Sequence, residues 1–301
     1  MHRKLLLYAA LAGGLAAQTT NYSYDSAGRL IEALYPDGTR LSYTYDPAGN
    51  MLRRLVTAAI QGPAPAASSN SVANAASFLG GPVAPGEMVT IFGTGIGPAN
   101  IANYALLTSG YLDTYAGETK VLFDGIPGPL IYAMSSQTTV MVPYSVAGKS
   151  STQMVIVYQG RSSAAITLPV AAAAPALFSS DFSGKGNGAI VNQDNSYNSP
   201  SNPADQGSVV QLYGTGEGQT SPAGVDGRIA TAVFPKPVLP VRVTVGGINA
   251  DVLYAGAAPY AAAGVFQINA RIPQGVASGA VPIVVSVGTL SSQPNLTVSV
   301  R

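Results

Sequence analysis

Apolar and polar positions alternate along most of residues 72–301, and Gly, Pro, Asn or Ser interrupts the pattern every few residues. Because successive side chains of a strand point to opposite faces, this period of two predicts short strands with one buried face. In the first half we expect strands at 88–92, 120–123, 130–133, 139–142, 153–158 and 165–170. In the second half we expect strands at 188–192, 209–213, 241–245, 252–254, 266–270, 281–287 and 296–300.

The two halves repeat one pattern. A turn glycine, a strand and a Gly-Thr-Gly-x-Gly run follow one another at 86–97 and again at 207–218, with equal spacing inside each block. Later blocks keep the same order, and a repeat of this kind predicts two copies of one structural unit. Short β-branched strands bounded by turn residues are typical of immunoglobulin-like sandwiches. We therefore expect an all-β protein with two tandem immunoglobulin-like β-sandwiches, at 72–176 and 177–301.

The N-terminal residues indicate export. Arg3 and Lys4 precede an apolar run at 5–15, and small residues follow at 15–17. The run is shorter than the roughly 20 residues that a membrane-spanning helix needs, so we expect a signal peptide at 1–17 that is cleaved. No later stretch is predicted to span a membrane. The mature protein is then expected outside the cell or at the cell surface.

Residues 18–57 predict a small β-hairpin segment. Tyr22-Ser23-Tyr24-Asp25 recurs as Tyr43-Thr44-Tyr45-Asp46, and each run leads into a glycine turn. These residues resemble the tyrosine-aspartate (YD) repeats of the RHS family. The segment is interpreted as a packed stalk, with a repeat remnant or a binding hairpin as the alternative. Residues 58–71, rich in Pro, Ala and Ser, are expected to be a linker.

The amino-acid composition narrows the classes of function that the protein can have. The chain has no Cys, and its single His is His2, inside the expected signal peptide. Without thiol or imidazole, the mature protein lacks Cys-His and Ser-His nucleophiles and histidine metal sites, although a carboxylate pair stays possible. Removing Arg3 and Lys4 from 15 basic residues leaves 13 against 14 acidic ones, so no basic surface predicts nucleic-acid binding. We expect no enzyme activity and no cofactor.

Two kinds of polar stretch contain residues that could bind a ligand, but turn formation explains both better. The Gly-Thr-Gly-x-Gly runs at 93–97 and 214–218 have the wrong spacing for a phosphate-binding loop, and no Lys-Ser pair follows. The run at 192–198 offers oxygen ligands for calcium but only one carboxylate, Asp194. We expect strand-end turns in the first case and Asx-turns in the second.

The connection at 98–118 is the most interesting loop. It carries Tyr104, Tyr111 and Tyr115, while the matching stretch of the second half, 219–236, contains no tyrosine. Tyrosines exposed together can stack on sugar rings or anchor a protein. The alternative is that they cap one end of the sandwich. These three are the possible ligand-binding residues, with an extracellular glycan or surface protein as the possible partner.

A second resemblance covers 72–301. The runs at 74–78, 85–94, 213–216, 254–256 and 267–273 resemble an uncharacterised C-terminal domain family of secreted acidobacterial proteins, and each half resembles IPT/TIG modules. The family implies no activity. The sequence predicts an exported, non-enzymatic structural or adhesive protein. The alternative is a carbohydrate-binding protein that uses the tyrosine loop.

Overall fold

The computed structural model describes residues 20–35, 39–57 and 63–301, so the expected signal peptide lies outside the described residues. The chain divides into two compact units, residues 1–62 and 63–301. The described residues form strands and two short 3-10 turns, and they include no α-helix. The all-β prediction is therefore confirmed. No helix in this part of the chain is long and apolar enough to cross a membrane.

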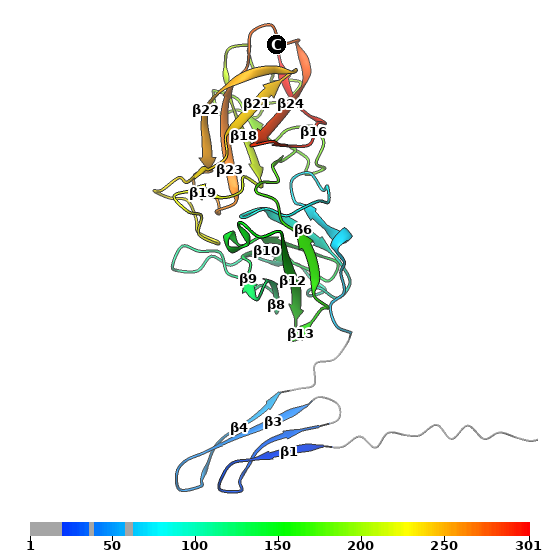
Figure 1. Cartoon of the computed structure of the whole chain (residues 1–301), viewed down its shortest axis with the longest axis vertical. Helices are drawn as coiled ribbons and strands as arrows, with labels where there is room; N and C mark the ends of the chain where they lie inside the picture. Colours follow the sequence, from blue (N-terminus) through cyan, green and yellow to red (C-terminus); the bar gives the residue numbers. More distant parts are fainter. Residues whose placement is uncertain (1–19, 36–38, 58–62) are drawn as a thin grey trace, which may run out of the picture. The chain divides into compact units, whose positions relative to one another are not determined.

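The first unit is a four-stranded antiparallel meander in the order β1-β2-β3-β4 (Figure 1). Its strands are β1 (Asn21–Tyr24), β2 (Leu30–Leu34), β3 (Arg40–Tyr45) and β4 (Met51–Thr57). Asp25 and Asp46 make the predicted turns: the Asp25 carboxylate accepts the N–H groups of Ala27 and Arg29 at 2.9 Å, and Asp46 accepts that of Asn50 at 2.8 Å. The segment is thus two linked hairpins.

The first sandwich packs two sheets face to face. One sheet has the order β5-β6-β11-β10-β7, and the other has β13-β12-β8-β9 with β14 beside β12. Its elements are β5 (Val72–Asn74), β6 (Met88–Phe92), β7 (Ala102–Asn103), β8 (Thr119–Phe123), β9 (Ile126–Pro127), β10 (Leu130–Ala133), β11 (Gln137–Met141), β12 (Ser151–Tyr158), β13 (Arg161–Ser162), β14 (Ile166–Pro169) and the 3-10 turns η1 (Ser69–Ser71) and η2 (Tyr144–Val146).

The second sandwich is one continuous hydrogen-bonded sheet folded over on itself, in the order β15-β18-β23-β22-β21-β24-β26-β16 (Figure 1). Its strands are β15 (Ala176–Leu177), β16 (Gly186–Asn187), β17 (Ile190–Val191), β18 (Val209–Thr215), β21 (Val241–Val245), β22 (Ile248–Ala257), β23 (Val265–Arg271), β24 (Gly279–Val287), β25 (Leu290–Ser291) and β26 (Leu296–Val300), with β17 beside β18 and β25 beside β24. β19 (Thr220–Ser221) and β20 (Lys236–Pro237) pair with each other in a separate two-stranded sheet.

The two sandwiches share one pairing scheme, as the sequence repeat predicts. β6 pairs with β11 as β18 pairs with β23, and β8 pairs with β12 as β21 pairs with β24. They differ at β22, which is one strand of 10 residues that pairs with β21 and then with β23. In the first sandwich Gly128 and Pro129 split the equivalent strand into β9 and β10.

Each sandwich has its own apolar core. The alternate residues Val89 and Ile91 of β6 are buried, as are Val210 and Leu212 of β18. They pack against residues of the facing strands, such as Phe123 in the first core. In β18 burial follows the predicted period of two from Val209 to Tyr213, whereas in β6 the intervening Thr90 is buried as well.

Residues 63–71, which the composition assigns to the linker, belong to the first sandwich. Ala66 is buried, and its N–H and carbonyl form a two-way backbone pair with Thr94 at 3.0 and 2.9 Å. In the second sandwich Ala176 pairs with Thr215, the residue equivalent to Thr94. Each Gly-Thr-Gly-x-Gly turn therefore packs on the segment that leads into its own sandwich. The rest of the expected linker, 58–62, lies outside the described residues.

Candidate functional site

The two sandwiches meet at a junction that chain segments from both sides build. Leu112 N–H donates to Gly227 O at 2.8 Å, and Ile229 N–H donates to Gly110 O at 3.1 Å. On β6, Met88 N–H donates to the Thr215 hydroxyl at 2.8 Å, and that hydroxyl donates onward to Gly264 O. The junction therefore extends the backbone hydrogen-bonding of each sandwich into the other.

Tyr144 of η2 crosses this junction. Its backbone N–H donates to the Asp226 carboxylate of the second sandwich at 2.8 Å. A Cβ placed on Gly224 would lie 2.2 Å from the Tyr144 ring, and one on Gly86 would lie 2.6 Å from it. Only glycine at both positions leaves room for the ring, because real Cβ contacts are wider. Tyr144 is thus inserted between a glycine of each sandwich.

The Glu217 carboxyl lies at the hydroxyl end of the Tyr144 ring. It is 1% exposed, and the Tyr144 hydroxyl donates a hydrogen bond to its carboxyl. Burial raises the pKa of Glu217 to about 8, against the lowering effect of the Tyr144 hydroxyl. Burial also raises the pKa of Tyr144, and the nearby Glu217 and Asp226 carboxyls raise it further. One carboxyl oxygen, Oε2 of Glu217, has no hydrogen-bond partner among the described residues.

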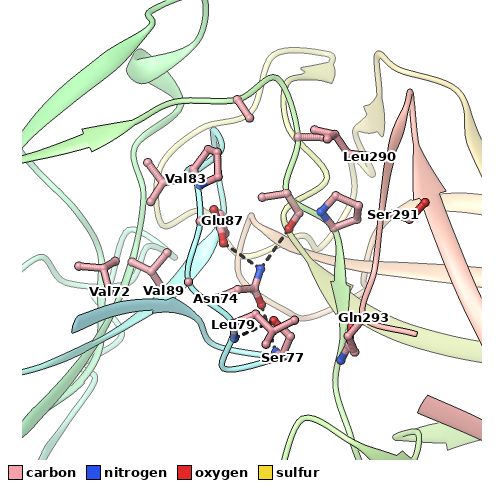
Figure 2. Close-up of a pocket in the computed structure, with 17 residues that line it drawn as sticks. Val72, Asn74, Ser77, Leu79, Val83, Glu87, Val89, Leu290, Ser291 and Gln293 are labelled. Carbon is pink, nitrogen blue, oxygen red and sulfur yellow. Dashed lines mark hydrogen bonds between the residues drawn. The ribbon is translucent and has the colours of Figure 1, made fainter. Parts of the chain in front are cut away.

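A pocket of about 210 Å³ opens on another part of the junction (Figure 2). We call it the junction pocket, and Val72, Asn74, Ser77, Leu79, Gly80, Gly81, Pro82, Val83, Glu87, Val89, Ala171, Ala173, Ala174, Pro175, Leu290, Ser291 and Gln293 line it. Figure 2 shows Glu87 and Asn74 between Val83 on one side and Leu290 and Ser291 on the other. Both sandwiches and the segment between them therefore contribute to its walls.

Glu87 and Asn74 form a polar centre in this pocket. Asn74 Nδ2 donates to Glu87 Oε1 at 2.8 Å and to Ala174 O at 3.0 Å, and Ala84 N–H donates to Glu87 Oε2 at 2.7 Å. Glu87 is 2% exposed, and burial raises its pKa to about 8 although both hydrogen bonds lower it. The group ties the start of the first sandwich to the segment that enters the second.

The tyrosine loop folds back toward the second sandwich. Tyr104 is 57% exposed and Tyr115 is 45% exposed, with the Lys120 ammonium 5.4 Å above the Tyr115 ring. Tyr111 is half-buried and forms an antiparallel backbone bridge with Arg228. The structure therefore separates the three candidate residues: two face solvent, and one lies at the junction.

The other polar stretches form turns. Gly216 has a φ of +81°, and a Cβ on it would lie 1.8 Å from Ala174 O, so its loop is a close backbone contact. Asp194 Oδ1 accepts the N–H and hydroxyl of Ser196 at 3.0 and 2.5 Å, which is the expected Asx-turn. Within the described ranges no three His, Cys, Asp or Glu residues come together as metal ligands.

Comparison with known proteins gives one family match. The family model "RHS Repeat" matches residues 24–59, which confirms the resemblance of the N-terminal segment. Among solved structures, the tandem immunoglobulin domains of titin are similar at 10% identity, with a TM-score of 0.18, over 80% of this chain and 100% of that one. No curated protein matches the chain. The resemblance to the acidobacterial domain family stays a prediction.

Sequence reasoning missed the buried carboxyls of the junction. Glu87 follows a turn glycine and Glu217 follows another, and acids in such places are usually solvated. The usable signal was the repeat: Glu217 stands where the first copy has Ile96, a core residue. An acid aligned with a core isoleucine indicates a buried carboxyl.

Proposed function

We propose that this chain is an exported, non-enzymatic structural or adhesive protein that acts at the cell surface or outside the cell. The observation that supports it best is the junction, where Tyr144 and two backbone pairs join the sandwiches. A spacer or adhesin has to hold its binding surfaces at a fixed separation. Interfaces with this much interlocked backbone and buried side chain resist domain motion.

Three further observations support the proposal. The expected signal peptide at 1–17 supports export, and the RHS Repeat match supports an assembly of repeated β-hairpins. The absence of Cys, and of His beyond position 2, leaves few catalytic side chains in the mature sequence.

The test measures the distance between the sandwiches. Because the chain has no Cys, spin labels can be placed only where wanted, at Ser150→Cys and Ser278→Cys, which are both exposed. Double electron–electron resonance should give one narrow distance distribution in the wild-type background. A broad distribution would contradict a rigid spacer. Cell fractionation with and without residues 1–17 tests export in parallel, and recovery of the full-length chain in the cytoplasm alone would contradict it.

The exposure of Tyr104 and Tyr115 favours a second candidate, a carbohydrate-binding protein. Aromatic faces open to solvent can stack on sugar rings, and the loop has little charge, so binding should depend weakly on salt. A glycan array with the wild-type chain and the Tyr104→Ala/Tyr115→Ala double variant tests it. Loss of a glycan signal at an unchanged melting temperature supports this candidate, and the absence of any signal contradicts it.

A further inference from the structure

The junction pocket contains one ionisable side chain, Glu87, and no Lys or Arg lines it. The Glu87 oxygens accept one hydrogen bond each, from Asn74 and from Ala84. An ionised carboxylate offers about four acceptor positions. When it is ionised, the carboxylate therefore keeps acceptor capacity, and no Lys or Arg among the lining residues stabilises its charge.

This arrangement selects among ligands by charge. A carboxylate or phosphate ligand would face a buried acid with no cation to offset it, which is costly in a low-dielectric site. A neutral alcohol could enter, but it brings no charge that would favour the ionised carboxylate. A cation supplies both the missing charge and up to three N–H donors, and charge-assisted hydrogen bonds are the stronger kind.

The apolar walls and the volume of the pocket determine the size and the apolar part of the ligand. Val72, Val83 and Leu290 are apolar, and the pocket volume is about 210 Å³. A cavity of about 150 Å³ is known to hold benzene, so there is room for roughly five to seven non-hydrogen atoms. We propose that the junction pocket binds a primary alkylammonium group, with the ammonium on the Glu87 carboxyl and the short aliphatic chain against the apolar walls.

Binding of the ammonium ion is coupled to ionisation of Glu87. Below pH 8 the free carboxyl is mostly protonated, because burial raises the pKa of Glu87 to about 8. When R–NH₃⁺ binds, the carboxylic proton leaves to solvent, the carboxylate forms, and the ammonium keeps its three protons. One proton is released for each amine bound. The affinity should therefore rise about tenfold per pH unit between pH 6 and 7.5, and fall above the amine pKa of about 10.4.

The test is an NMR titration of the full chain with n-butylammonium chloride, following the Asn74 side-chain amide and the Ala84 N–H. Both should shift with saturation, and a weakly buffered sample should acidify by about one proton per site filled. The neutral n-butanol and the anionic butyrate are matched controls and should bind at least tenfold more weakly. Equal binding of n-butanol, or no proton release, would overturn the proposal.

Two variants locate the site. Glu87→Gln removes the charge and should abolish n-butylammonium binding. Leu79→Trp enlarges an exposed side chain that lines the pocket and leaves the Glu87 carboxyl in place, so it tests the site independently and should also abolish binding. Ser278→Phe, at an exposed position that does not line the pocket, is the matched control and should bind normally. Unchanged affinity in Leu79→Trp would overturn the assignment.

One further arm distinguishes the source of the amine. Nα-acetyl-lysine methylamide presents the same butylammonium group on a peptide backbone. Binding as tight as that of n-butylammonium would assign the pocket to a lysine side chain of a partner protein. Binding of n-butylammonium alone would assign it to free small amines. Failure of both would overturn the proposal, and it would leave the spacer function untouched because that rests on the spin-label distances.

Discussion

Glu217 occupies in the second sandwich the position that Ile96 occupies in the first, and both side chains are buried. Ile96 packs into its own core. Glu217 instead faces Tyr144, which arrives from the other sandwich. The same position of the repeat therefore serves the core of one copy and the junction of the two.

We expect Glu217 and Tyr144 to be energetically coupled. Tyr144→Phe and Glu217→Leu each leave one buried polar group without its partner, at a cost of about 1–3 kcal/mol each. The double variant removes both groups and should be less destabilised than the sum, with a coupling of about 0.5–3 kcal/mol. Urea denaturation of the four proteins measures this. Strictly additive effects would show that the two side chains do not interact.

Stability should fall as pH rises from about 5 to 8. Burial raises the pKa of Glu87 and Glu217 from 4.5 to about 8, so the folded chain holds protons that the unfolded chain releases. The free energy of unfolding then decreases by up to about 1.4 kcal/mol per pH unit for each group, and levels off above pH 8. Urea denaturation from pH 5 to 9 checks it, with Glu217→Gln expected to show a shallower slope. A flat profile from pH 5 to 8 in the wild type would be inconsistent with two buried neutral acids.

Gly224→Ala should loosen the junction. The new Cβ would lie 2.2 Å from the Tyr144 ring, so the ring has to leave its place between the sandwiches. We expect a broadened spin-label distance distribution between positions 150 and 278 and a lower melting temperature. Gly80→Ala is the control, because its Cβ would sit at an ordinary 3.6 Å from Val72 O. Equal behaviour of the two variants would mean that Tyr144 does not hold the junction.

Thr90 should be sensitive to substitution although it lies on the outer face of β6. The alternation of β6 predicts tolerance of alanine there, but Thr90 is buried and its hydroxyl lies 2.8 Å from that of Thr139. Thr90→Ala leaves Thr139 unpaired and should cost about 1–3 kcal/mol.

Ile91→Ala and Leu212→Ala, in the two cores, should cost about 2–5 kcal/mol. Gln211, half-buried on β18, should tolerate alanine within about 1 kcal/mol, as calorimetry can check.

Residues 63–71 should contribute to the stability of the first sandwich. A chain that begins at Pro63 keeps the two-way backbone pair between Ala66 and Thr94. A chain that begins at Val72 loses it and exposes the strand-end turn. We expect the shorter chain to melt several degrees lower in a thermal scan. Identical melting temperatures would indicate that residues 63–71 act only as a linker.

Local pattern determined much of this protein. The period of two located β6, β8, β10, β21 and β26 within a residue of their observed bounds, and the repeat predicted two sandwiches with the same strand pairing. The reason is that strand formation and inward-facing positions depend on neighbouring residues and on burial of one face. The YD turns were equally readable, because Asp and Gly act on their own backbone.

Only the tertiary structure decided the junction. Tyr144 meets Asp226 across 82 residues, and Asn74 meets Ala174 across 100. No local period encodes such contacts, since they depend on how two finished sandwiches dock. The same holds for Thr90, whose polarity indicates an exposed face until the folded chain covers it. Local sequence determined the strands and turns. Packing between segments that are distant in the sequence determined which carboxyl groups are desolvated and where a pocket forms.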